Sequence, residues 1–133
     1  MAKGYESNQE RVRMIASFGK DLARRARSRC ELCETTGVKL TAYEVPPEPK
    51  VPDFDRCLFL CDRCREQAEN PKRFEPGEEW RCLAQAIWSE VPAVQVMAVR
   101  LLRRQADSQN WARETLEQAY LDPEIETWAD QAE

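Results

Sequence analysis

The sequence predicts a mostly helical α+β fold built around a small four-cysteine module. Two Cys-x-x-Cys pairs, Cys30/Cys33 and Cys61/Cys64, flank a short segment that is rich in β-forming residues and proline. Apolar residues recur at helical spacing before and after that segment. We therefore expect one compact domain with three parts: an N-terminal amphipathic basic helix over residues 1–29, the four-cysteine module over 30–70 and a C-terminal helical region over 71–133.

The first element is predicted to be a single helix over residues 8–28. Its apolar residues fall three or four apart, on one face: Val12, Ile15, Phe18, Leu22 and Ala26. Basic residues crowd its last turns, where cations favour the negative end of the helix dipole: Arg24, Arg25, Arg27 and Arg29. Gly19 lies inside this helix, at a cost of about 1 kcal/mol relative to alanine.

Two short strands are predicted next. Residues 38–45 alternate and are rich in β-forming residues, and residues 57–60 form an apolar run that leads into Cys61. Four prolines between residues 46 and 52 forbid regular structure there, so the two strands are expected to be joined by a loop.

The rest of the chain is predicted to be helical. A short helix over 62–69 ends at Asn70-Pro71, and a proline-containing loop follows. A helix over 78–90 would place Trp80, Leu83, Ala84, Ile87 and Trp88 on one side. Three further helices are expected over residues 92–107, 110–120 and 124–131.

The two cysteine pairs predict one structural zinc ion per chain, held by Cys30, Cys33, Cys61 and Cys64. Four soft thiolates in a tetrahedron suit zinc, and each Cys-x-x-Cys turn can supply two of them. The first pair follows a helix and the second begins one, with 27 residues between Cys33 and Cys61. This order indicates a treble-clef or zinc-ribbon module.

The cysteines could also serve two functions other than zinc binding. A redox dithiol of the thioredoxin kind needs a βαβ setting, which the sequence lacks. An iron–sulfur cluster is the second alternative, although the spacing does not match the ferredoxin patterns. Cys57 and Cys82 are interpreted as small buried hydrophobic residues.

The chain contains no histidine. Catalytic zinc keeps an open position and normally uses histidine or carboxylate ligands, so a four-cysteine site points to structure. Catalytic triads and dyads built on histidine are excluded, and no glycine-rich phosphate loop is present. The sequence therefore favours a protein that is not an enzyme and offers no catalytic residue.

Composition also sets the expected location. No stretch approaches the roughly 18 apolar residues of a membrane span, and the N-terminus lacks the apolar region of a signal peptide. We expect a cytoplasmic protein with no membrane partner.

The net charge of −4 is unevenly spread. Residues 1–30 carry eight Lys or Arg against three acids, whereas residues 105–133 carry Arg113 against eight acids. The asymmetry indicates either a basic face that meets an anionic partner or two ends that neutralise each other. The acidic balance of the whole chain favours the second interpretation.

Part of the module resembles the HNH nuclease family. The resemblance is carried by three segments: Cys30-Glu31-Leu32-Cys33, Tyr43-Glu44-Val45-Pro46-Pro47 and Leu60-Cys61-Asp62-Arg63-Cys64. In that family a histidine-containing catalytic pair precedes the proline on the hairpin strand, and another histidine often follows the last cysteine. Tyr43-Glu44 and Arg65 stand at those positions here. The resemblance implies the scaffold of a nuclease without its metal-dependent cleavage.

Nearly the whole chain is similar to the bacterial PhnA-type zinc-ribbon proteins, a family named after an alkylphosphonate operon. The similarity extends over six segments: residues 19–26, 30–33, 43–47, 80–83, 91–96 and 120–122. Members are often labelled phosphonoacetate hydrolase. Hydrolysis of that kind needs a di-metal site of Asp and His, which this chain cannot build without histidine.

The favoured function is a non-catalytic structural-zinc protein that acts as an adaptor or regulatory binding module. Two alternatives stay open: a phosphonate-metabolism enzyme, as the family label suggests, and a nucleic-acid-binding module of HNH descent. For the latter, phosphate contacts are expected from four residues: Arg24, Arg25, Arg27 and Arg29. The partner is then a protein or a nucleic acid.

Overall fold

The structure, a computed structural model, describes residues 2–132. It is mostly helical with one two-stranded sheet, as the sequence predicts. In chain order the helices and strands are α1 (Ala2–Ser17), α2 (Gly19–Ala26), β1 (Leu40–Glu44), β2 (Cys57–Cys61), α3 (Asp62–Glu69), α4 (Leu83–Ala86), α5 (Pro92–Gln105), α6 (Asn110–Gln118) and α7 (Pro123–Asp130). Three short 3₁₀ helices intervene: η1 (Phe54–Arg56), η2 (Pro71–Arg73) and η3 (Glu78–Cys82).

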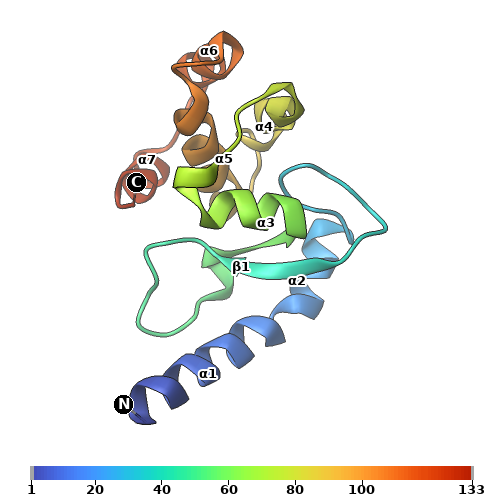
Figure 1. The fold of residues 1–133 in the computed structure, drawn as a ribbon, viewed down its shortest axis with the longest axis vertical. Helices are drawn as coiled ribbons and strands as arrows, with labels where there is room; N and C mark the ends of the chain where they lie inside the picture. Colours follow the sequence, from blue (N-terminus) through green and yellow to red (C-terminus); the bar gives the residue numbers. More distant parts are fainter. Residues whose placement is uncertain (1, 133) are drawn as a thin grey trace.

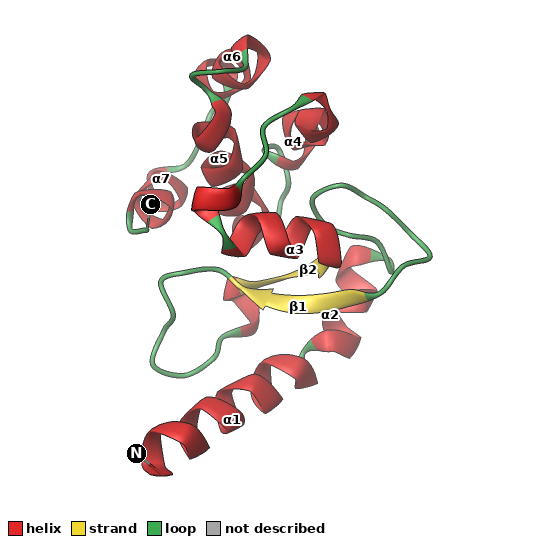
Figure 2. Ribbon diagram, in the orientation of Figure 1, coloured by secondary structure: helices red, strands yellow, loops and turns green. Residues whose placement is uncertain are grey.

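The hairpin lies at the centre of the molecule. Strands β1 and β2 pair antiparallel, with Ala42 opposite Phe59 and Glu44 opposite Cys57. Helices α1 and α2 lie on one side of the sheet, and α3 with the C-terminal helices lies on the other (Figures 1 and 2). The sheet therefore lies between the N-terminal helices and the C-terminal helices.

Each face of the hairpin has its own hydrophobic core. On the α2 side, Leu22 packs with Ala42, Cys57 and Phe59. On the other side, Leu58 and Leu60 belong to a larger core that includes most of α5. Alternate residues of a strand point to opposite faces, so one short strand can serve both cores. This is why β2 is buried along its whole length.

The prediction of a single helix over residues 8–28 is wrong in one respect, because the helix is interrupted between Ser17 and Gly19. Helix α1 contacts β1, whereas α2 contacts both β1 and β2. Phe18 sits at the break and meets the Phe54 ring edge-on at 5.7 Å. Glycine weakens a helix interior, so Gly19 is where the bend costs least. The bend brings α2 against β2 as well as β1.

The helix predicted over residues 78–90 is also wrong in detail. The segment begins as the 3₁₀ helix η3, continues as one turn of α4 and ends near Ile87. The Trp80 indole donates a hydrogen bond to Glu75 O at 2.9 Å, which holds the segment close to the preceding loop. Gln95 Nε2 donates to Ile87 O at 3.0 Å and so caps the end of the turn. Trp88, expected on the buried side, is 56% exposed.

The exposure of Trp88 yields a fluorescence prediction. Trp80 is buried, and Trp111 and Trp128 are partly buried. Trp88→Phe should therefore remove most of the emission that iodide can quench and change the free energy of unfolding by less than about 0.5 kcal/mol. Stern–Volmer titration of the variant and the parent protein checks this. Undiminished quenching in the variant would contradict the placement of Trp88.

The other predicted elements are confirmed within a few residues. The strand over 38–45 is β1, the run over 57–60 is β2, and the three last helices are α5, α6 and α7. The division of the domain into three parts, with boundaries at residues 29/30 and 70/71, stays a prediction. Within residues 2–132, none of the helices combines the length and the apolar character needed to cross a membrane.

Candidate metal centre

The structure brings the two cysteine pairs together. The sulfurs of Cys30, Cys33, Cys61 and Cys64 all lie within 4.8 Å of one another, and none is in a disulfide. The Cys33 and Cys61 sulfurs are 3.7 Å apart. Two sulfurs bound tetrahedrally to one zinc ion at about 2.3 Å would be about 3.8 Å apart, whereas a disulfide needs about 2.05 Å. The four cysteines can therefore hold one metal ion.

The first pair lies in a tight turn that follows α2. The Cys30 N–H donates to Thr35 O at 3.0 Å, and the Glu34 N–H donates to Cys30 O at 2.8 Å. Glu34 adopts a left-handed conformation, with φ of 64°. These bonds curl the chain so that both sulfurs of the pair point the same way.

The turn is docked on strand β2 through Glu31. Its N–H donates to Phe59 O at 2.8 Å, and its carboxylate accepts the Phe59 N–H at 2.8 Å. The same carboxylate accepts two bonds from the Arg25 guanidinium, at 2.7 and 3.1 Å. Arg25 also donates to Cys57 O at 2.9 Å. One buried carboxylate thus ties the end of α2, the cysteine turn and the sheet together.

The second pair lies at the start of α3, as predicted. Cys61 is the N-cap residue of α3, and its sulfur accepts the Cys64 N–H at 3.5 Å. The partial positive charge of a helix N-terminus favours a thiolate there. Cys61 also closes strand β2, so the ligand belongs to the sheet and to the helix at once.

Hydrogen bonds among the clustered cysteines shift the pKa values of Cys30, Cys33 and Cys64 in different directions. The pKa of Cys33 is lowered, chiefly because the Cys30 thiol donates a hydrogen bond to the Cys33 sulfur. The pKa of Cys30 is raised to about 11, chiefly by the same hydrogen bond. The pKa of Cys64 is raised as well, first through its hydrogen bond with Cys30. These hydrogen bonds favour the thiolate form at Cys33 and the thiol form at Cys30 and Cys64.

This pattern predicts a steep pH dependence of metal binding. A raised thiol pKa means that the proton is present at neutral pH and must leave when the metal binds. Because the pKa values of Cys30 and Cys64 are both raised, metal binding displaces at least two protons. The apparent zinc affinity should therefore weaken by about a hundredfold or more per unit as pH falls from 8 to 6. Competition with a chromophoric chelator at pH 6, 7 and 8 measures this slope. An affinity independent of pH would contradict the assignment.

The four arginines near the end of α2 do not act as one group. Arg25 is partly buried and bound to Glu31, whereas Arg24, Arg27 and Arg29 are exposed. Arg24 lies 3.9 Å from Asp21 across an exposed ion pair. All four arginines were predicted to contact phosphate, but Arg25 is already bound to Glu31 within the fold.

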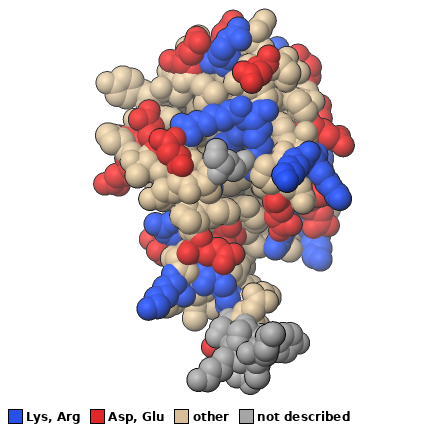
Figure 3. All heavy atoms as spheres, turned by 60° about the vertical axis from the view of Figure 1, so that its left-hand side comes forward, with Lys and Arg blue, Asp and Glu red and all other residues tan. Residues whose placement is uncertain are grey.

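The two ends of the chain are not joined by ion pairs among the residues that the structure describes. The long-range pairs of residues 8–30 go to the module instead, as in Arg11 with Glu44 and Arg25 with Glu31. On the face in Figure 3, basic and acidic side chains lie next to one another. Charge is thus balanced mainly between close neighbours on that face.

The two remaining cysteines lie outside the cluster. Cys57 is fully buried, and burial raises its pKa to about 11, as expected for an inert core thiol. Cys82 is only partly buried, yet burial again raises its pKa to about 11. The buried hydrophobic role predicted for both is confirmed for Cys57 and holds only in part for Cys82.

Glu31 and Thr35 are the residues near the site that the sequence analysis missed. The Thr35 hydroxyl lies 3.2 Å from the Cys33 sulfur and can donate to a thiolate. Glu31 sits between the first two ligands, but its partner Phe59 is 28 residues away, so spacing alone gives no sign of the bond. An acidic residue inside a Cys-x-x-Cys turn is the only local signal.

Comparison with protein-family models, with curated proteins and with solved structures found no significant match. The similarity to PhnA-type and HNH proteins therefore stays a prediction.

Proposed function

We propose that this chain is a non-catalytic structural-zinc protein that works as a binding module. The observation that carries the proposal is the convergence of four cysteine sulfurs, from two turns 27 residues apart, into a cluster within 4.8 Å. Four thiolates form the ligand set of a structural zinc site and leave no open coordination position for a substrate.

The placement of the ligands supports a treble-clef arrangement. A cysteine turn precedes the β1–β2 hairpin, and the second pair begins α3. Zinc bound there would link the turn, the sheet and the helix at one point. Such sites contribute folding free energy directly, which suits a module with only two short strands.

The residues at the positions of the HNH catalytic set support a non-catalytic role. Glu44 is bound to Arg11 through two hydrogen bonds, at 2.7 and 3.0 Å. Arg65 donates to Thr41 Oγ1 and to Ala42 O and pairs with Glu69 at 2.7 Å. These side chains are engaged in structural contacts. The absence of histidine from the chain further disfavours the phosphonate hydrolase alternative.

Elemental analysis of the purified protein tests the zinc assignment. We expect about one zinc per chain and little iron. Chelation with EDTA at a concentration that strips the zinc should lower the melting temperature, and readdition of zinc should restore it. A protein free of zinc that melts at the same temperature as the loaded one would refute the proposal.

A further inference from the structure

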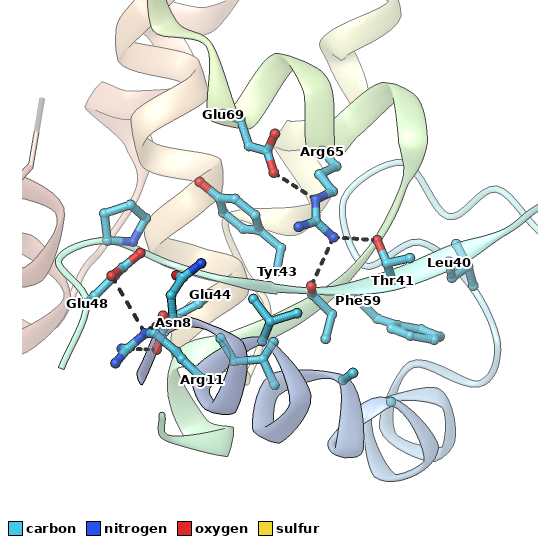
Figure 4. Close-up of a pocket in the computed structure, with 16 residues that line it drawn as sticks. Asn8, Arg11, Leu40, Thr41, Tyr43, Glu44, Glu48, Phe59, Arg65 and Glu69 are labelled. Carbon is cyan, nitrogen blue, oxygen red and sulfur yellow. Dashed lines mark hydrogen bonds and ion pairs between the residues drawn. The ribbon is translucent and has the colours of Figure 1, made fainter. Parts of the chain in front are cut away.

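A cavity of about 610 Å³ runs along strand β1, between α1 on one side and α3 on the other (Figure 4). All five residues of β1 line it, from Leu40 to Glu44. Successive side chains of a strand point to opposite faces, so a cavity that touches all five opens onto the outer edge of the strand. The wall is supplied by α1 below β1 and by Arg65 and Glu69 of α3 above it.

The pairing register identifies which backbone groups face this edge. In an antiparallel pair, opposite residues alternate between bonding each other and pointing their backbone groups outward. The Val45 N–H donates to Arg56 O, so the bonded positions continue at Tyr43 and Thr41. The N–H and C=O groups of Ala42 and Glu44 therefore point outward. Arg65 confirms the direction, because its guanidinium donates to Ala42 O at 3.2 Å.

The two edges of the sheet are treated differently. The outer edge of β2 is covered. The Phe59 N–H donates to the Glu31 carboxylate, Phe59 O accepts the Glu31 N–H, and Cys57 O accepts from Arg25. On β1, Arg65 satisfies the carbonyl of Ala42. Among the residues that the structure describes, none bonds to the N–H of Ala42 or of Glu44. An uncovered strand edge is a template for pairing with another chain.

We propose that the edge of β1 binds an extended peptide, which adds to the hairpin as a third strand. The inference rests on the proposed function, because it names the partner chemistry of the binding module. Main-chain hydrogen bonds from the N–H groups of Ala42 and Glu44 supply the pairing, and the flanking helices select the side chains.

The two walls select different side chains. On the α1 side, Val12 and Ile15 face the cavity together with the ring of Phe59, which forms an apolar surface. The lining as a whole carries three carboxylates against two guanidiniums, so it is net negative. Glu48 and Glu69 are exposed, and they pair with Arg11 and Arg65 respectively. The fitting peptide alternates apolar residues, directed at α1, with Lys or Arg, directed at the acidic rim.

A free peptide suits this groove better than a second copy of the chain. A paired strand lies about 4.8 Å from β1, within the space between α1 and α3. The β1 strand of a second copy is itself flanked by its own α1 and α3, which would enter the same space. The groove thus favours a single strand without flanking helices.

The test uses full-length protein that carries about one zinc per chain, and a fluorescent peptide as the probe: Gly-Ser-Lys-Val-Lys-Ile-Lys-Val-Gly-Ser. Its control has the same composition in blocks: Gly-Ser-Lys-Lys-Lys-Val-Val-Ile-Gly-Ser. We expect the alternating peptide to bind about tenfold more tightly by fluorescence anisotropy. N-methylation of every second residue of the probe should abolish binding in one frame and preserve it in the other, because alternate N–H groups face β1.

Hydrogen exchange by NMR locates the peptide. Saturating probe should slow exchange of the Ala42 and Glu44 amides, while that of Tyr43 is already slow in the free protein. On the protein side, Val12→Lys should weaken binding about tenfold, and Met14→Lys should stay within about twofold. Both residues are exposed on α1, at 58% and 42%, but Met14 does not line this cavity.

Failure of the zinc-loaded protein to bind the probe, unchanged Ala42 and Glu44 exchange, or equal effects of the two methylation frames would each overturn the inference. Protection that rises with protein concentration in the absence of probe would assign the edge to a second copy and overturn it as well. In all of these results the measured zinc content and chelation melt still stand, so the proposed function is judged separately.

Discussion

Cys61→Ser is expected to abolish stoichiometric zinc binding and to destabilise the fold by several kcal/mol. Cys61 ends β2, caps α3 and belongs to the four-sulfur cluster, so its loss breaks the link between sheet and helix. Structural zinc typically contributes about 10–16 kcal/mol of apparent free energy at pH 7, of which three remaining ligands retain only a part. Elemental analysis and urea unfolding of the variant measure both effects.

Cys82→Ser is the matched control for that experiment. Cys82 is a free cysteine outside the cluster, so its variant should keep one zinc per chain and nearly the same unfolding midpoint. Cobalt substitution adds a spectroscopic check, since four thiolates give a tetrahedral cobalt spectrum that the Cys61 variant should lose. Full zinc content in Cys61→Ser would remove Cys61 from the ligand set.

Glu31→Ala should cost about 3 kcal/mol of unfolding free energy in the zinc-loaded protein. The Glu31 side chain is only 7% exposed and accepts three hydrogen bonds, from Arg25 and from the Phe59 N–H. Its removal leaves a largely buried guanidinium without its carboxylate partner and the Phe59 N–H without its acceptor, which is costly in a low-dielectric site. Urea unfolding at fixed zinc concentration measures the loss.

Two comparisons make the Glu31 prediction specific. Glu78→Ala removes the partner of Arg81 from an exposed ion pair, 2.6 Å long, and should cost less than about 1 kcal/mol. In a double-mutant cycle, Arg25→Ala combined with Glu31→Ala should cost less than the sum of the two single changes. Additive losses, or a Glu31 variant as stable as the parent protein, would show that the carboxylate does not dock the cysteine turn.

Local signals predicted much of this fold. The strand over 38–45 is signalled by alternation and β-forming residues, and the strand over 57–60 by a short apolar run. The helix over 62–69 is bounded by its own end signals. The four cysteines that can hold a metal ion were predicted in the same way, because a Cys-x-x-Cys turn is a local motif. Each of these features depends on residues that are near one another in the chain.

The errors have a common cause in tertiary packing. The helix break between Ser17 and Gly19 lies where the packing changes, since α1 contacts β1 and α2 contacts both strands. The exposure of Trp88 follows from bonds that shorten the helix after residue 78, including the one from Gln95 to Ile87 O. Helical periodicity indicates which residues share a helix face. It does not indicate where contacts with a neighbouring element end the helix.

By itself the sequence predicted the four-cysteine cluster, the lack of histidine chemistry and most of the helices and strands, because spacing and composition are local properties of the chain. Only the tertiary structure decided that Glu31 and Arg25 cover one edge of the hairpin while the N–H groups of Ala42 and Glu44 stay open at the other. Hydrogen bonds between residues about 30 positions apart depend on the packing of whole elements, and no short segment of the sequence encodes them.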